Sequence, residues 1–176
     1  SNAVRLRIKC CVDTLCAKVC AQIYILINQK ITLQNEIDPI DNAIATNKPI
    51  HHVVINAAKV VNAQKDEQLK ESIVSCDIIN ADGQAIVWAS RFLNRPLPER
   101  VAGIDLMQEL VKLSAEKKYR IFFLGAKEEV VKEVLNVYTQ LYNKDIIAGY
   151  RNGYFSKEEE PEVAKQIAAS SANILF

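Results

Sequence analysis

Three polar residues, Asn56, Asp82 and Arg100, stand where the side chains of α/β proteins usually meet ligands. Asn56 follows the apolar residues 53–55, and Asp82 follows the apolar residues 78–79 in the segment N-A-D-G. A carboxylate placed there can act as a general base that removes a proton from an attacking hydroxyl. An asparagine can hold a sugar hydroxyl or an acetamide through its two donors and its acceptor.

Arg100 lies in the segment P-L-P-E-R, in which two prolines stiffen the chain, and Asp105 follows in a second Gly-x-Asp. A guanidinium can donate paired hydrogen bonds to a diphosphate and stabilise charge on a departing nucleotide. A structural interpretation stays open for each residue. Asn56 and Asp82 are also typical helix N-caps, a role compatible with chemistry, and Arg100 could pair with Glu99 on the surface.

A second group of residues could hold a nucleotide. Gly125, Ala126 and Lys127 form an expected turn from a strand into a helix, whose N-terminus can attract an anion. Tyr150 belongs to a Gly/aromatic segment, G-Y-R-N-G-Y-F, which is expected to form a loop after a strand. Its aromatic rings could stack on a nucleobase or close the edge of the core.

Several chemistries have no motif here. The sequence contains no D-x-D, G-x-S-x-G, H-E-x-x-H or C-x-x-C, so we expect no metal and no other cofactor. The two histidines, His51 and His52, stand together at a strand start, where a solvated edge is the simpler interpretation. The four cysteines between positions 10 and 20 fit a reduced, cytosolic helix better than a zinc site.

Composition indicates one domain of 176 residues, with 49% hydrophobic residues and a net charge of +1. This charge balance predicts no nucleic-acid partner. Residues 4–27 are apolar in part, but Lys9, Asp13 and Lys18 interrupt them, so an amphipathic helix is expected rather than a membrane span. The first three residues, S-N-A, are typical of a cleaved expression tag.

Strand and helix patterns alternate from residue 22 onward, which predicts a Rossmann-like α/β fold with a mainly parallel sheet and helices on both faces. A small N-terminal β-hairpin is expected over residues 23–33. Further strands are predicted at residues 52–55, 77–79, 120–124, 146–148 and 174–176. Helices are predicted at residues 38–47, 57–75 with a break near Lys65, 84–93, 105–117, 127–142 and 156–169. The helix at 38 has Pro39 in its first turn, that at 105 has Asp105 and Gln108 as a capping box, and that at 156 has Ser156 and Glu159.

Four ordered blocks carry a family resemblance: N-A-D-G-Q-A-I-V-W-A-S-R, P-L-P-E-R-V-A-G-I-D-L, R-I-F-F-L-G-A-K and G-Y-R-N-G-Y-F. From about Ile25 to Phe176 the sequence resembles the WecG/TagA/CpsF glycosyltransferases. We therefore expect an N-terminal segment, residues 1–22, and a glycosyltransferase domain, residues 23–176. The resemblance implies that Asp82 is the base and that Asn56 and Arg100 contact substrate. It also implies that Val54 replaces a family threonine.

Members of the TagA type transfer N-acetylmannosamine from UDP-ManNAc to undecaprenyl-diphosphate-linked GlcNAc, inverting the anomeric centre without a metal, in wall teichoic acid synthesis. The resemblance thus implies a UDP-sugar donor, a lipid-linked acceptor and a cytoplasmic protein at the inner face of the bacterial plasma membrane. The family continues past the last strand with a basic segment that reaches the membrane. We therefore expect sequence beyond Phe176, weak activity without it, and self-association through the uncovered last strand.

Two alternatives remain open at this point. The chain could be a non-catalytic nucleotide-binding or assembly module, which the valine at position 54 would favour. It could also be a transferase of the same family that uses another UDP-sugar, such as UDP-ManNAc uronate.

Overall fold

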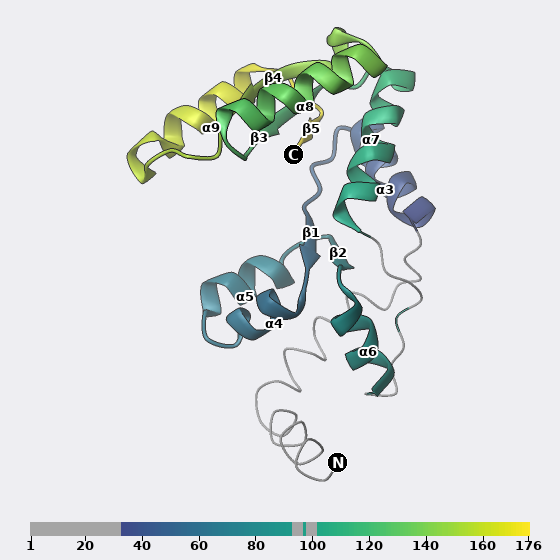
Figure 1. The fold of residues 1–176 in the computed structure, drawn as a ribbon, viewed down its shortest axis with the longest axis vertical. Helices are drawn as coiled ribbons and strands as arrows, with labels where there is room; N and C mark the ends of the chain where they lie inside the picture. The colour runs from purple at the N-terminus through teal and green to yellow at the C-terminus, as the bar shows by residue number, and fades with distance from the viewer. Residues whose placement is uncertain (1–32, 93–96, 98–101) are drawn as a thin grey trace. The chain divides into compact units, whose positions relative to one another are not determined.

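The computed structural model describes residues 33–92, Leu97 and residues 102–176 (Figure 1). Close packing divides the chain into two compact units, Ser1–Leu106 and Met107–Phe176, which are called unit 1 and unit 2 below. The cysteine-rich segment and all of the expected hairpin except Leu33 lie outside the described residues. Both units have the α/β character that the alternating pattern predicts, with parallel strands in two small sheets.

The described elements of unit 1 are α3 (Leu33–Ala45), β1 (His52–Ile55), α4 (Ala57–Ala63), α5 (Glu67–Val74), β2 (Ile78–Ala81), α6 (Gln84–Phe92) and the first residues of α7 (Gly103–Lys117). Unit 2 holds the rest of α7, followed by β3 (Ile121–Leu124), α8 (Glu128–Leu141), η1 (Lys144–Ile146), β4 (Ile147–Arg151), η2 (Lys157–Glu159), α9 (Glu160–Ala169) and β5 (Ile174–Leu175). The predicted break near Lys65 is confirmed, because α4 ends at Ala63 and Asp66 caps α5.

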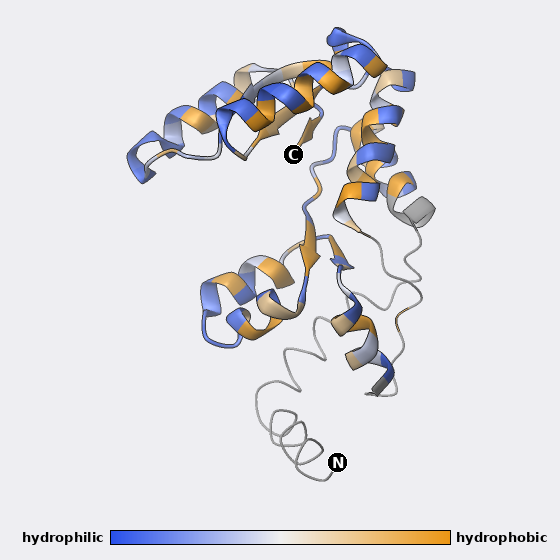
Figure 2. Cartoon of the chain, viewed as in Figure 1, coloured by the Kyte–Doolittle hydropathy of each residue, from blue (hydrophilic) through white to orange (hydrophobic). Residues whose placement is uncertain are grey.

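Strands β1 and β2 form a parallel pair in which Val54 lies opposite Asn80 and Ile55 opposite Ala81. Side chains alternate between the two faces of such a pair. One face packs against α4 and α5 around a core of Ile55, Ala63, Ile73, Ile79, Ala81 and Leu97. The other face carries His52, Val54 and Asn80, and it meets the start of α7 at Gly103. Helices thus lie on both faces of this pair, and Figure 2 shows the hydrophobic colouring of β1.

The sheet of unit 2 has the strand order β4–β3–β5, and all its neighbours are parallel. The chain therefore moves from β3 outward to β4 and then crosses back to β5 on the other side of β3. Residues of α7 and α8 cover the face of β3 that carries Ile121 and Phe123, with Val111 and Val131 buried between them. Rings of Tyr138 and Phe176 lie 6.0 and 5.8 Å from that of Phe123.

Several expected boundaries are wrong, among them the start of α9, which is Glu160 rather than Ser156. Helix α3 begins at Leu33 rather than Asp38, so Pro39 lies inside it. An internal proline costs roughly 3 kcal/mol. Ile40 and Ala43, three residues apart on one side of the helix, are buried there and offset that cost. Helix α7 begins at Gly103, two residues before Asp105, and β4 extends to Arg151, three residues past its expected end.

Candidate functional site

Asn56 and Asp82 directly follow the last paired residues of two neighbouring parallel strands, Ile55 and Ala81. The Asp82 backbone N–H donates to the Ile55 carbonyl at 2.8 Å, which ties the end of β2 to the end of β1. The sequence pattern predicts this juxtaposition, because the carboxyl ends of parallel strands share one edge of the sheet. Unit 1 therefore brings a carboxylate and an amide side chain to the same edge.

Asn56 is an exposed N-cap of α4, and its Oδ1 accepts the Lys59 backbone N–H at 2.9 Å. The structural interpretation of Asn56 is thus confirmed, while its amide nitrogen can still donate to a ligand. Asp82 is half-buried and precedes Gly83, whose φ of 104° lies in the left-handed region that favours glycine. This glycine lets the chain turn sharply from β2 into α6, so that Asp82 stays at the strand end.

Lys59 is a residue that sequence reasoning missed. Its Nζ donates to the Val54 carbonyl at 2.7 Å, so its positive charge lies near the end of β1. The sequence could have indicated Lys59 by its position three residues after Asn56, in the first turn of the helix that Asn56 caps. A cation at this strand end suits an anionic ligand.

Asp105 is exposed and lies inside the first turn of α7, where its N–H donates to the Ala102 carbonyl at 3.0 Å. It is therefore not the cap of that helix, which corrects the expected capping box with Gln108. Asp105 adds a carboxylate two residues after Gly103, the residue that meets Val54. Arg100, the proposed diphosphate ligand, lies outside the described residues.

The turn Gly125, Ala126 and Lys127 connects β3 to α8 as expected. Gly125 and Ala126 both adopt positive φ angles, 142° and 57°. The turn is held by the following strand and loop: the Gly125 N–H donates to the Arg151 carbonyl at 3.1 Å, and the Gly153 N–H donates to the Ala126 carbonyl at 3.0 Å. The loops that follow β3 and β4 thus form one connected surface, with Lys127 exposed at the N-cap of α8.

Tyr150 belongs to β4 rather than to a loop, which corrects its expected setting. Its ring packs with the core of unit 2, and its hydroxyl hydrogen-bonds with Glu128 in the first turn of α8. A hydrogen bond from Lys132, followed by one from Asn152, holds the pKa of Glu128 below its usual value. Tyr150 is thus engaged in a polar cluster with a carboxylate in the first turn of α8.

Tyr154 is the more accessible aromatic residue of the same segment. Its side chain is 72% exposed in the loop after β4, and its backbone N–H donates to Asn152 Oδ1 at 3.0 Å. The neighbouring Arg151 is paired with Glu159 at 2.8 Å and lies over the Phe155 ring at 5.7 Å. The Ser156 N–H donates to Glu159 at 2.9 Å, which confirms the predicted capping box. These contacts fix the loop that presents Tyr154.

The half-buried His52 and the buried Asn80 form a polar pair on the face of β1 and β2 that carries Val54. Asn80 is 1% exposed. Burial lowers the pKa of His52, a hydrogen bond with Asn80 opposes this shift, and the charge of Lys59 adds to it. His51 is exposed, as expected of a solvated strand edge, whereas the Nε2 atom of His52 is buried, which corrects the expectation for this second histidine.

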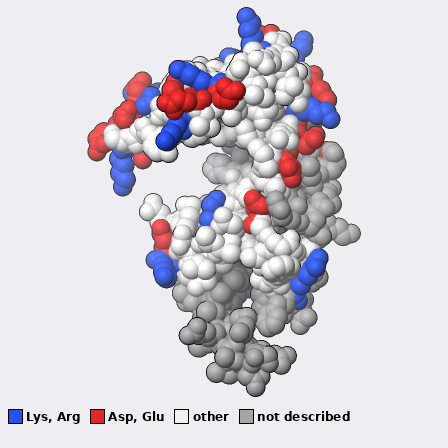
Figure 3. All heavy atoms as spheres, in the orientation of Figure 1, with Lys and Arg blue, Asp and Glu red and all other residues white. Residues whose placement is uncertain are grey.

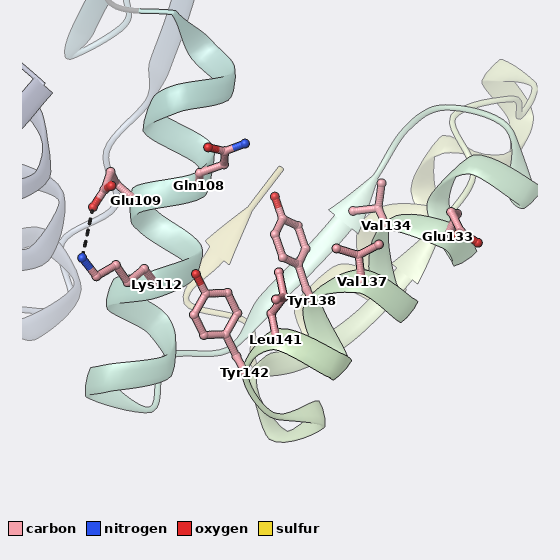
Figure 4. A pocket seen from close by; sticks show the side chains of 9 residues that line it. All are labelled: Gln108, Glu109, Lys112, Glu133, Val134, Val137, Tyr138, Leu141 and Tyr142. Atoms are coloured by element: carbon pink, nitrogen blue, oxygen red, sulfur yellow. Dashed lines mark ion pairs between the residues drawn. The ribbon is translucent and has the colours of Figure 1, made fainter.

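Unit 2 also contains a groove between α7 and α8, away from the strand ends (Figure 4). Its volume is about 500 Å³, and its floor is formed by Val134, Val137, Tyr138, Leu141 and Tyr142 of α8. The α7 side contributes Gln108 and the pair Glu109–Lys112, 4.0 Å apart. On the face in view, Figure 3 shows acidic and basic side chains interspersed over unit 2. Within the described residues, no helix is long and apolar enough to cross a membrane.

The parallel strands and the helices between them define a Rossmann-like α/β fold. Comparison with known proteins gives the family. Residues 23–176 match the profile described as "Glycosyl transferase WecG/TagA/CpsF family". The match covers nearly all of the chain, and the protein belongs to this family.

Two curated relatives are similar to this chain, and both are named N-acetylglucosaminyldiphosphoundecaprenol N-acetyl-beta-D-mannosaminyltransferase. The protein of Bacillus subtilis strain 168 is 36% identical over 122 residues, which are 69% of this chain and 47% of the relative. That of Bacillus spizizenii is 33% identical over 130 residues, or 74% of this chain and 50% of the relative. The chain thus spans about half the length of the curated relatives it matches.

Proposed function

We propose that this chain carries the catalytic base of a transferase that moves N-acetylmannosamine from UDP-ManNAc to undecaprenyl-diphosphate-linked GlcNAc. The observation that carries the proposal is the placement of Asn56 and Asp82 on adjoining strand ends in a member of a glycosyltransferase family. The names of the two relatives support the choice of sugar and acceptor.

The proposed reaction is a single displacement with inversion. Asp82 takes the proton from the acceptor hydroxyl, and that oxygen bonds to the anomeric carbon of the donor sugar. The bond from this carbon to the diphosphate oxygen breaks, and UDP departs with the electron pair. Arg100 stabilises the charge that develops on the diphosphate, and Asp82 then releases its proton to water.

The remaining site residues are assigned to binding. Asn56 and Asp105 offer a donor amide and an acceptor carboxylate to sugar hydroxyls or the acetamide. The turn of Gly125, Ala126 and Lys127 is proposed to contact the nucleotide through its backbone and the Lys127 charge. In place of Tyr150, whose hydroxyl is held by Glu128, the exposed Tyr154 is the better candidate for stacking on the uracil ring.

Two measurements test this function. UDP is titrated into the protein, and transfer from UDP-ManNAc to a GlcNAc-diphospho-lipid is measured. We expect UDP binding and sugar transfer, at equal rates with and without EDTA. Absence of both UDP binding and transfer would overturn the proposed function.

A second candidate function is a nucleotide-binding module without catalysis. The observation that favours it is Val54, whose methyl groups pack at the start of α7 instead of offering a hydroxyl. UDP binding without transfer would support this module. Transfer from UDP-ManNAc uronate, but not from UDP-ManNAc, would leave the assignment of Asp82 as the base unchanged and would change the assigned donor sugar.

A further inference from the structure

The start of α7 is seated directly on β1 through one contact. A Cβ added to Gly103 would lie 3.2 Å from Val54 Cγ2 and 3.9 Å from the other branch of the same side chain. The first of these distances is tighter than most contacts of a Cβ atom, so a larger residue at position 103 would push Val54 by a few tenths of an ångström. Ala102, immediately before Gly103, is buried.

Val54 has little freedom to yield to such a push. Its backbone is paired in register beside Asn80, which is almost completely buried, and its carbonyl accepts the hydrogen bond from Lys59. A β-branched side chain is also stiff about its first torsion angle. Part of the displacement would therefore be taken up by the first turn of α7, to which Gly103 belongs.

Two proposed substrate contacts stand close in sequence to this point. Asn56 lies two residues after Val54 on β1, and the exposed Asp105 lies two residues after Gly103 in α7. Both positions belong to unit 1. The packing of Gly103 on Val54 therefore fixes the position of the first turn of α7, which carries Asp105, relative to the end of β1.

We propose that Val54 and Gly103 are positioning residues, which set Asp105 against the Asn56 end of the site and thereby tune the transfer step. The proposal rests on the proposed function. In this proposal, the branched side chain of Val54 sets the distance between β1 and the first turn of α7 by packing against Gly103. A reacting group that is misplaced by a fraction of an ångström loses catalytic efficiency even when every group is present.

A size-compensation experiment tests this role. Gly103→Ala adds the clashing methyl group, and Val54→Ala removes the atoms that it meets. We expect Gly103→Ala to lower kcat about three- to tenfold, with a smaller change in the donor KM. The double variant should recover most of the lost rate. The melting temperature of Gly103→Ala should stay close to that of the wild type, because alanine favours a helix over glycine. A lower kcat in this variant would then not be caused by unfolding.

The matched control is Val53→Ala, which removes the same two methyl groups from the residue before Val54. The side chain of Val53 lies on the opposite face of β1 and packs against the core formed with α4 and α5. It should lower stability without a selective effect on kcat. A wild-type rate in Gly103→Ala, or a double variant as slow as the single one, would overturn the proposal.

Amide NMR spectra separate this proposal from the proposed function. In Gly103→Ala the resonances of Asn56 and Asp105 should move, and in the double variant they should return. If the wild-type protein transfers no sugar, the proposed function fails, yet shifts that revert would still support the positioning contact. Unmoved resonances in Gly103→Ala would overturn it whatever the activity.

Discussion

The backbone N–H of Asp82 is bonded to the carbonyl of Ile55, at 2.8 Å, one residue before Asn56. The hydrogen bond continues the pairing of β1 and β2 past their last paired residues, Ile55 and Ala81. Asp82 is thus held by the neighbouring strand through its backbone, two residues before α6 begins at Gln84. A side chain can serve as a base only if it is placed in this way, with its support supplied by other atoms.

Replacing Asp82 by asparagine should lower kcat by on the order of a hundred- to ten-thousandfold, with little change in UDP affinity. Asparagine keeps the size and shape of the side chain but cannot take the proton. The control is Asp66→Asn, because Asp66 caps α5 by accepting the Leu69 N–H at 3.0 Å and has no proposed chemical role. A rate above about half of wild type in Asp82→Asn would remove Asp82 from the mechanism.

Replacing Arg100 by alanine should weaken UDP binding and slow transfer, and lysine should restore only part of the loss. Lysine supplies the charge without the planar pair of donors that fits a diphosphate. Arg91→Ala is the matched control, since Arg91 is exposed in the last turn of α6. Equal function of the alanine and lysine variants would return Arg100 to a surface role.

Tyr154→Ala should raise the Kd for UDP about five- to a hundredfold, the range that one lost stacking contact produces. Tyr154→Phe should bind normally because the ring remains. Tyr150→Phe removes only the hydroxyl that meets Glu128 and should leave Kd near the wild-type value. Titration calorimetry with UDP measures all three, and a larger loss of affinity in Tyr150→Phe than in Tyr154→Ala would assign the contact with UDP to the Tyr150 hydroxyl instead of to stacking on Tyr154.

The stability of the protein should fall with pH below about 6.5 through His52. Burial lowers its pKa from the usual 6.5, so the folded state takes up a proton less readily than the unfolded state. The contribution is therefore fully present above 6.5 and is lost as the pH falls through the lower pKa of the folded state. The effect reaches at most about 1.4 kcal/mol for each pH unit in that window.

Thermal unfolding of wild type and of His52→Gln between pH 7.5 and about 5 measures this loss. The variant should lack the His52 component of the decline, whereas His51→Gln, at the exposed neighbour, should keep it. Parallel curves for wild type and His52→Gln would show that the buried ring does not couple to folding.

The positions of Asn56 and Asp82 could be predicted because each follows an apolar run that only a buried strand explains, and local chemistry then dictates a turn and a cap. The family resemblance is likewise a property of the sequence, and the profile match confirms it. The length of α3 could not be predicted from Pro39, since burial of Ile40 and Ala43 outweighs a local rule. Residues 23–32 and Arg100 lie outside the described part, so their interpretations stay predictions.

The sequence by itself determined the order of strands and helices, the polar residues at two strand ends, and the family. These follow from periodicity and local capping, which depend on neighbours along the chain. Only the tertiary structure decided that Val54 packs on Gly103, that His52 is buried beside Asn80, and that Glu128 engages Tyr150 while Tyr154 faces solvent. Each of these contacts depends on strand register and on the close approach of elements far apart in sequence. Contact distances of a few ångströms decide which side chain is held by its neighbours and which remains accessible to a ligand.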